Sequence, residues 1–489
     1  MRILFVNPAT SKYTRSVSVP LGLLSIASYL ESKGYGVKIY DRTVEKVDLE
    51  SVVNEFKPDL VGISMISYKS TRDTLDVAKH LNRCGIPVIV GGPFATVLAD
   101  KVLEYDFIDA ISLGEGEETW LELADCYASN KPFLRDIKGL AFKDEEGKII
   151  FTEMRDFIDL SLLPPINWEL VDVPKYFQSS YGCKKMIYLY AAKGCPHSCT
   201  FCYNKEFHRC KYRKRPLEML LSEIKHLVES YGVDGVYFAD EMWCRNREEM
   251  RNVCARFKEM QLDFVWGCQT RIGLFDLQDF TYMYECGCRW IFFGVESGSE
   301  DMLNKINKKI RYDRIEDTFK ACRQANIACI GSFISGFPEE TEQNLLETVE
   351  LIKKLDTSLI NFNYLALIPG SDIYKKLVES GRHTELKSLE DYSKQNPMEK
   401  LEYNYSDIPD IDIKVVRAYY MWRSFFATDV PGTEKFGFAK KVITDALKSV
   451  KTGELIPFVV SIWFSVKEFL KTAYYANCFP SVKKKYGLK

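Results

Sequence analysis

The sequence predicts an α/β protein that consists of a doubly wound domain, a partial or full (β/α) barrel and a carboxy-terminal helical region. Two observations predict this fold class. Short apolar runs alternate with helical patterns in residues 1–130, and the alternation resumes at residue 186 and continues to residue 395. Short buried strands separated by helices are typical of parallel sheets that helices cover.

The first series of apolar runs predicts an open parallel sheet in residues 1–130. The expected elements are strands at Arg2–Val6, Val37–Tyr40, Leu60–Ser64, Val88–Val90 and Ala110–Leu113 and a helix over Leu21–Lys33. Ligands bind such sheets at the carboxyl ends of the strands, and small residues there let a large ligand approach the backbone. The residues at these ends are Asn7, Pro8, Ser64 to Ser67, Gly91, Gly92, Pro93, Gly114, Glu115 and Gly116.

Residues 131–185 are expected to be a connector with a small β element. A hairpin-like stretch runs over Leu140–Glu153 with Gly147 in its turn. In residues 186–395, six βα-like units in a row predict the barrel, whose active site lies at the carboxyl ends of its strands. The expected strands are Ile187–Ala191, Gly235–Phe238, Asp263–Gly267, Trp290–Val295, Cys329–Ile334 and Phe362–Leu367, with helices over Leu217–Tyr231 and Asn344–Leu355.

Composition sets the broad class of the protein. A chain of 489 residues with 46% hydrophobic and 27% charged residues is expected to form about two to four globular domains. The formal net charge of −2 does not favour a nucleic-acid partner. The amino terminus reads as a buried strand and not as a signal peptide, and no apolar run approaches the length of a membrane span. We therefore expect a cytoplasmic protein.

Three of the fifteen cysteines stand at a ligand-like spacing directly after the first expected barrel strand. Cys195, Cys199 and Cys202 are separated by three and then two residues. Cysteine thiolates suit iron–sulfur clusters, and three ligands for a cluster of four irons leave one iron open to a cofactor or substrate. The alternatives are a zinc site that His197 and Cys210 complete and three unrelated thiols.

The stretch from Lys193 to Asn204, with Phe201 just before the last cysteine, resembles the signature of the radical S-adenosylmethionine superfamily. The resemblance implies that Cys195, Cys199 and Cys202 hold a 4Fe–4S cluster whose open iron chelates S-adenosylmethionine. Reductive cleavage then gives a 5′-deoxyadenosyl radical. The implied contacts of S-adenosylmethionine are Tyr203, Asp240, Gln269, Arg271 (methionine carboxylate), Glu296 (ribose hydroxyls), Ser332, Gly336 (adenine) and Leu367.

The domain order resembles the cobalamin-binding class of that superfamily over residues 1–385. The motifs that carry this resemblance are Pro20-Leu21-Gly22, Gly91-Gly92-Pro93 and Gly114-Glu115-Gly116. It implies a Rossmann-like cobalamin-binding domain whose contacts are Pro20, Leu21, Gly22, Ser64, Ser67, Gly91, Gly92, Gly114 and Glu115. None of the five histidines lies in an Asp-x-His-x-x-Gly motif, so we expect no histidine ligand to cobalt from this domain. The alternative is a domain that serves only as a scaffold or substrate cap.

Residues 396–489 form the expected helical region, with helices over Val415–Phe426 and Phe436–Val450. Its aromatic residues, such as those at 419–422, are expected to be core or an apolar lid over the barrel. A second interpretation places the apolar stretch at 456–464 on a membrane surface as a peripheral contact.

The leading hypothesis is therefore a cobalamin-dependent radical methyltransferase that acts on an unactivated carbon of a small-molecule or lipid substrate. An electron donor such as ferredoxin or flavodoxin would supply the reducing electron. The alternatives are a non-methylating radical enzyme, such as a cyclase that forms a ring, and a zinc-bound ligand-binding protein.

Overall fold

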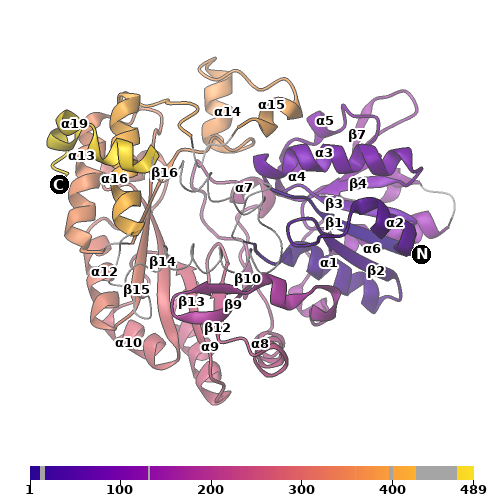
Figure 1. Ribbon diagram of the computed structural model, residues 1–489, viewed down its shortest axis with the longest axis horizontal. Coiled ribbons are helices and arrows are strands. Elements are labelled where there is room, and N and C mark those ends of the chain that lie inside the picture. The colour runs from indigo at the N-terminus through magenta and orange to yellow at the C-terminus, as the bar shows by residue number, and fades with distance from the viewer. Residues whose placement is uncertain (11–16, 130–132, 358, 396–399, 426–470, 489) are drawn as a thin grey trace. The chain divides into compact units, whose positions relative to one another are not determined.

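The computed structural model describes residues 1–10, 17–129, 133–357, 359–395, 400–425 and 471–488. The chain divides into two compact units. The first comprises Met1–Phe177, Lys193–His226 and Leu367–Asn396, and the second comprises Gln178–Ala192, Leu227–Ala366 and Pro397–Lys489. In the described residues, each unit is built on one seven-stranded sheet (Figure 1).

The first sheet has the strand order β2-β1-β3-β4-β5-β6-β7. Its first five strands are parallel, and β6 and β7 are antiparallel additions at one edge. The order of the parallel strands is that of a doubly wound fold whose ligands bind at the carboxyl ends, as the sequence predicted. The strands are β1 (Arg2–Asn7), β2 (Gly36–Asp41), β3 (Leu60–Ser64), β4 (Val88–Gly91), β5 (Ala110–Ser112), β6 (Leu140–Lys143) and β7 (Ile149–Phe151).

Helices cover both faces of this sheet (Figure 1). They are α1 (Leu21–Ser32), α2 (Leu49–Phe56), α3 (Tyr68–Arg83), α4 (Pro93–Val97), α5 (Ala99–Val102) and α6 (Glu117–Ala128). On one face Trp120 of α6 packs edge-on against Phe5 of β1, with ring centroids 4.7 Å apart. On the other face, alternate strand residues such as Val61 and Val88 join α2, α3 and α4 in one buried cluster. Because successive residues of each strand are buried on opposite faces of the sheet, the strands appear in the sequence as continuous apolar runs.

Two later segments belong to the first unit. The single-turn helix η1 (Leu134–Asp136) precedes β6, the residues after β7 form the single-turn helices η2 (Leu160–Leu162), η3 (Trp168–Leu170) and η4 (Val173–Tyr176), and residues 193–226 belong to the same unit. The segment that follows the last barrel strand also packs here, through α14 (Asp372–Glu379) and α15 (Leu389–Ser393). Leu389 and Tyr392 of α15 lie in the same buried cluster as α3.

The second sheet has the order β16-β15-β14-β13-β12-β9-β8. Six of its strands are parallel and follow one another in the chain, and β8 pairs antiparallel with β9 at one edge. Because β9 and β16 are the ends of the parallel series in the described residues, the structure is a partial barrel. The strands are β8 (Gln178–Ser180), β9 (Cys183–Leu189), β12 (Gly235–Phe238), β13 (Val265–Thr270), β14 (Cys288–Glu296), β15 (Ala328–Ser335) and β16 (Ile360–Tyr364).

Helices pack against the outer face of the second sheet, where the aromatic rings of Phe238, Trp243, Phe257 and Trp266 contact one another. These helices are α9 (Arg247–Glu259), α10 (Leu277–Glu285), α11 (Glu300–Lys305), α12 (Arg314–Gln324) and α13 (Glu342–Leu355), whereas α8 (Leu217–Tyr231) precedes β12 and most of its residues belong to the first unit. Several begin at a side-chain cap, and α13 starts with a reciprocal capping box between Thr341 and Asn344.

The carboxy-terminal region adds α16 (Asp410–Phe425) and α19 (Pro480–Lys485) to the second unit. Tyr420 of α16 is buried and stacks on Phe362 of β16, so this aromatic residue is core. The helix expected over 436–450 and the stretch 456–464 lie outside the described residues. Among the helices that are described, none is long and apolar enough to cross a membrane.

Candidate functional site

Residues 194–204, which we call the cluster loop, follow the short strand β10 (Ala192–Lys193). Cys195, Cys199 and Cys202 lie in this loop as half-buried thiols, and none of the three forms a disulfide. Gly194 opens the loop with φ of 80°, and a Cβ at this position would overlap the carbonyl oxygen of Lys211. Only glycine fits this tight start of the loop.

Asn204 holds the cluster loop in shape. Its buried side chain accepts a hydrogen bond from the Cys195 N–H (3.0 Å) and donates to the carbonyl oxygens of Cys195 (2.7 Å) and His197 (3.0 Å). The Cys202 N–H donates to the Cys199 carbonyl oxygen (3.1 Å), which closes a turn between these two cysteines. Sequence reasoning did not assign Asn204 a role, because its partners are backbone atoms.

The donor set of the cluster loop fits an iron–sulfur cluster, since one short loop carries three thiols. Cys210, the residue that could have completed a zinc site, directs its Sγ to the carbonyl oxygen of His197 (3.5 Å). Burial raises the pKa of the Cys210 thiol. Within the described ranges, no three His, Cys, Asp or Glu side chains are arranged to hold a single metal ion.

Glu115 links the loop after β5 to both ends of the segment that carries the cysteines. Its buried carboxylate forms a double ion pair with Arg213 of β11 (Arg213–Lys214) and lies 3.9 Å from Lys193 Nζ and 3.6 Å from His208 Nδ1. Burial alone would raise the pKa of Glu115, but Lys193, His208 and Arg213 together lower it to about 2. Glu115 is therefore ionised and fixes the segment from 193 to 214.

The other residues expected to contact cobalamin follow the strands of the first sheet. Ser64 ends β3, Gly91 ends β4, and Gly114 follows β5. Gly92 has φ of 102°, and a Cβ there would lie 2.9 Å from the Met65 carbonyl oxygen. At Gly22 in α1, a Cβ would meet nothing within 4 Å, so the space beside it is open. Pro20 is the N-cap of α1, Leu21 is its first residue, and Ser67 is the N-cap of α3.

The second unit gathers several of the expected S-adenosylmethionine contacts at the carboxyl edge of its sheet. Asp240 follows β12, Gln269 lies near the end of β13, Glu296 ends β14, and Gly336 follows β15. Ser332 lies within β15, where its hydroxyl is 3.4 Å from the Asn363 amide of β16. Neighbouring parallel strands end at the same edge, so the topology brings these positions together.

Asp240 and Arg271 already have backbone partners. The buried carboxylate of Asp240 accepts hydrogen bonds from the N–H groups of Ala191 (2.9 Å) and Ala192, the residues that lead into the cluster loop. Burial raises the pKa of Asp240 above its usual value. Arg271 donates to the carbonyl oxygen of Lys308. The binding roles of both residues stay predictions.

Glu296 has an unusual backbone and a buried partner. Its φ of 72° lies in the left-handed region, at an irregularity in the pairing of β14 with β15. The ammonium group of Lys308 lies 2.7 Å from Glu296 Oε1, and both side chains are buried. Residues other than glycine are uncommon in this conformation, so the surrounding structure must hold Glu296 there. The Lys308 partner was not found from the sequence.

Glu340 shapes the loop after β15. Its fully buried carboxylate accepts from the N–H groups of Gly336 (2.6 Å) and Phe337 (3.1 Å) and from the Ser335 hydroxyl (3.2 Å). Burial raises the pKa of Glu340 to about 7, although these hydrogen bonds act in the opposite direction. Glu340 was not among the site residues that the sequence predicted.

Two expected S-adenosylmethionine contacts, Tyr203 and Leu367, belong to the first unit. Tyr203 is the N-cap of α7 (Asn204–Phe207). The carbonyl oxygen of Leu367 accepts a hydrogen bond from Tyr68 of α3.

Comparisons with known proteins agree with this arrangement. Residues 13–124 match the family model of the B12 binding domain, and residues 189–352 match that of the Radical SAM superfamily. The chain is 28% identical to an uncharacterized methyltransferase of Pyrococcus horikoshii, over 90% of this chain and 96% of the relative. It is 27% identical to the anaerobic magnesium-protoporphyrin IX monomethyl ester cyclase of Rubrivivax gelatinosus, over 87% of this chain and 78% of the relative.

Among solved structures, the radical S-adenosylmethionine methyltransferase TsrM of Kitasatospora setae has a similar fold. The TM-score is 0.68 at 19% identity, over 78% of this chain and 76% of the TsrM chain. With the two family models and the cluster loop, the chain is a radical S-adenosylmethionine enzyme. Its B12-binding domain places it in the cobalamin-dependent branch of that superfamily, which uses a 4Fe–4S cluster, S-adenosylmethionine and cobalamin.

Proposed function

We propose that the chain transfers a methyl group to an unactivated carbon of a small-molecule substrate. The observation that carries this proposal is the Glu115 network, which ties a strand-end loop of the B12-binding domain to the segment that bears the three cysteines. When bound, the cluster would supply the electron that cleaves S-adenosylmethionine, and cobalamin would supply the methyl group.

The chain's own residues would bind and orient these groups. Cys195, Cys199 and Cys202 would ligate three irons, and Asn204 would keep their backbone in the required shape. Glu296 would accept hydrogen bonds from the ribose hydroxyls, because an ionised carboxylate is an acceptor suited to a diol. Lys308 would hold Oε1 of Glu296 and so fix the direction of that carboxylate.

The remaining expected contacts would complete the two cofactor sites. In the second unit, Asp240, Gln269, Arg271, Ser332 and Gly336 would contact S-adenosylmethionine, and Tyr203 and Leu367 of the first unit stay predicted contacts. Open space at Gly22 and the positive φ of Gly92 and Gly114 favour close approach of cobalamin to the backbone. A ferredoxin or flavodoxin would be the electron donor, and the cytoplasm would be the site of the reaction.

The test is anaerobic reconstitution of the full chain with iron, sulfide and cobalamin, followed by S-adenosylmethionine and a one-electron reductant. We expect the mass spectrum to contain both 5′-deoxyadenosine and S-adenosylhomocysteine. The Cys199→Ser variant should form no deoxyadenosine, whereas the matched Cys210→Ser variant should form it at the wild-type level. Equal loss in both variants, or no deoxyadenosine in the wild type, would refute the proposal.

A ring-forming reaction is the second candidate, because the cyclase relative covers 87% of this chain. Deoxyadenosine without S-adenosylhomocysteine favours that reaction, since a cyclase consumes the radical without transferring a methyl group. A further measurement is whether the purified protein retains cobalamin, which a domain serving only as a scaffold would not do.

A further inference from the structure

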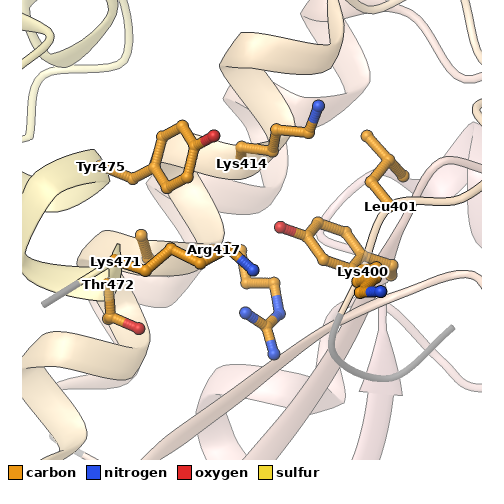
Figure 2. A pocket seen from close by; sticks show the side chains of 9 residues that line it. Lys400, Leu401, Lys414, Arg417, Lys471, Thr472 and Tyr475 are labelled. Atoms are coloured by element: carbon orange, nitrogen blue, oxygen red, sulfur yellow. The ribbon is translucent and has the colours of Figure 1, made fainter. Parts of the chain in front are cut away.

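Cationic side chains gather at more than one place in the described residues. One place is a cavity of about 210 Å³ beside α16, which presents Lys414 and Arg417 there (Figure 2). Another is the segment 193–214, which contains the cluster loop and in which Glu206 is the single acidic residue. The cations of that segment are Lys193, Lys205, Arg209, Lys211, Arg213 and Lys214. Because the segment also bears the three cysteines, its charges bear on the chemistry of the candidate site.

Several cations in and beside this segment have a carboxylate of their own. The ion pairs are Lys193 with Glu117 (2.8 Å), Arg213 with Glu115, Lys205 with Asp372 of α14 (2.7 Å) and Lys375 of α14 with Glu206 (2.6 Å). Opposite charges at such short distances largely cancel in their effect on a third group. These paired residues therefore add little net charge to the surroundings of the cluster loop.

Arg209 is held by neutral partners. Its Nη2 donates to the carbonyl oxygen of Arg155 (2.8 Å), and its guanidinium carbon lies 4.0 Å from the centroid of the Phe157 ring. Within the described ranges, Arg209 forms no ion pair with an aspartate or glutamate, and its buried Nε has no hydrogen-bond partner. A half-buried cation without a counter-charge costs free energy. An anion bound nearby would offset that cost.

The surrounding structure fixes the position of the Arg209 charge. The φ angles of Arg209 (50°) and Cys210 (52°) lie in the left-handed region, which residues other than glycine seldom adopt. The guanidinium carbon of Arg213 lies 4.1 Å from the centroid of the same Phe157 ring, so one ring contacts both arginines. Arg213 is itself fixed by its ion pair with Glu115. The Arg209 guanidinium therefore has a defined place beside this network.

The residues on either side of Arg209 contact the cluster loop. The Cys210 Sγ lies 3.5 Å from the His197 carbonyl oxygen, and the His208 N–H donates to the carbonyl oxygen of Asn204 (2.9 Å). Both acceptors belong to the loop that bears the three cysteines. The backbone of Arg209 therefore lies next to that loop.

The charge of a cluster in this loop sets the sign of the effect. Three thiolates outweigh the positive charge of an oxidised 4Fe–4S core, so the ligated cluster is an anion, and reduction adds one more negative charge. A nearby cation stabilises the reduced state more than the oxidised state. Because the reduction potential of such clusters depends on the net charge around them, a fixed cation beside the loop raises it.

We propose that Arg209 raises the reduction potential of the cluster that Cys195, Cys199 and Cys202 hold. Arg209 acts on the cluster through its charge, and Phe157 is the positioning residue that keeps the guanidinium beside the loop. A weaker reductant then suffices to supply the electron. This inference rests on the cluster and not on the proposed methyl transfer.

The experiment measures the reduced fraction of the cluster in the anaerobically reconstituted full chain, by electron paramagnetic resonance of samples poised at known potentials without S-adenosylmethionine. At a fixed potential, Arg209→Gln should lower the ratio of reduced to oxidised cluster by about twofold to fivefold, the size expected for a partly exposed charge. This fall corresponds to about 20–40 mV, at about 59 mV per tenfold change for one electron.

Two further variants separate charge from packing. Arg209→Lys keeps the charge and should stay close to the wild type. The matched control is Arg289→Gln, because Arg289 also stacks on a ring, 4.2 Å from the centroid of Tyr284, but near the amino end of β14. It should leave the potential unchanged.

Equal potentials in the wild type and Arg209→Gln would overturn the inference. Equal shifts in Arg209→Gln and Arg209→Lys would also overturn it, because the effect would then come from lost packing. If Arg209→Gln takes up no iron, Phe157→Leu decides, since it keeps every charge but releases the guanidinium from the ring. A smaller fall in potential in that variant supports the inference, and an unchanged potential refutes it.

The measurement needs no S-adenosylmethionine, so its failure refutes the role of Arg209 alone. Absence of S-adenosylhomocysteine in the activity assay would refute methyl transfer and leave the role of Arg209 intact.

Discussion

Replacing Glu115 with glutamine is expected to destabilise the first unit and to loosen the cluster loop. Glutamine keeps the size of the side chain but removes the charge that faces Arg213 and Lys193. Both cations are largely buried, with side chains 17% and 15% exposed. In the variant, each of these two cations would remain largely shielded from water and would have lost this carboxylate as a partner.

The expected cost follows from the partners that remain. Breaking a buried ion pair by removing one partner costs about 3–5 kcal/mol. Lys193 keeps Glu117, whose carboxylate is 2.8 Å away, so the lower end of that range applies. A loss of about 3 kcal/mol would lower the melting temperature of a unit of this size by about 6–12 °C.

The assay is scanning calorimetry of the full chain under anaerobic conditions, together with the iron content after reconstitution and gel filtration. The control is Glu153→Gln, because Glu153 is 72% exposed and lies 2.9 Å from Lys138, which is 50% exposed, and an exposed pair contributes about 0–1 kcal/mol. Glu115→Gln should melt earlier and retain less iron than the control. If the two variants melt together and hold equal iron, Glu115 does not fix the cluster segment.

Three further changes test other parts of the site. Asn204→Ala removes three hydrogen bonds to the backbone of the cluster loop, about 3 kcal/mol in total, and should lower the iron bound per chain; wild-type iron would contradict this. The raised pKa of Glu340, about 7 against 4.5, means that the folded state holds its proton more tightly. The wild type should therefore lose up to about 3 kcal/mol of stability, measured by urea unfolding, as pH rises from about 5 to about 8. Glu340→Gln should lack this slope, and an equal slope would be the contrary result. Gly298→Ala would place a Cβ 2.8 Å from the Glu347 carbonyl oxygen of α13, so we expect it to lower the melting temperature, unlike Gly22→Ala in α1, where the backbone is helical and a Cβ meets nothing within 4 Å.

The sequence predicted the parts of the fold and site that depend on local pattern. The alternation of strands and helices placed β3 and β12 at their observed ends, and cysteine spacing located the cluster loop. The last barrel strand was expected at Phe362–Leu367 but runs over Ile360–Tyr364, because pairing with β15 sets its register. Leu365 and Leu367 are buried outside any strand. The apolar character of a residue does not by itself distinguish a buried loop position from a buried strand position.

Sequence patterns could not predict the side-chain contacts that hold the site together. Arg213 is 98 residues from Glu115 in the chain, and no periodicity links them. Lys308 stands in a short run of polar residues after α11 and gives no sign of its contact with Glu296. Asn204 and Glu340 bind mainly backbone groups, whose positions become known only when the loops are built.

The packing of α15 limits how the B12-binding domain can be isolated. Tyr392 is buried, its ring faces those of Tyr68 and Phe94, and Leu389 is fully buried beside them. A fragment that stops near residue 130 would expose this apolar face to water, and a carboxy-terminal deletion that removes α15 would do the same from the opposite end of the gene. Domain dissection of this enzyme must therefore keep residues 367–396, even when only the first third of the chain is of interest.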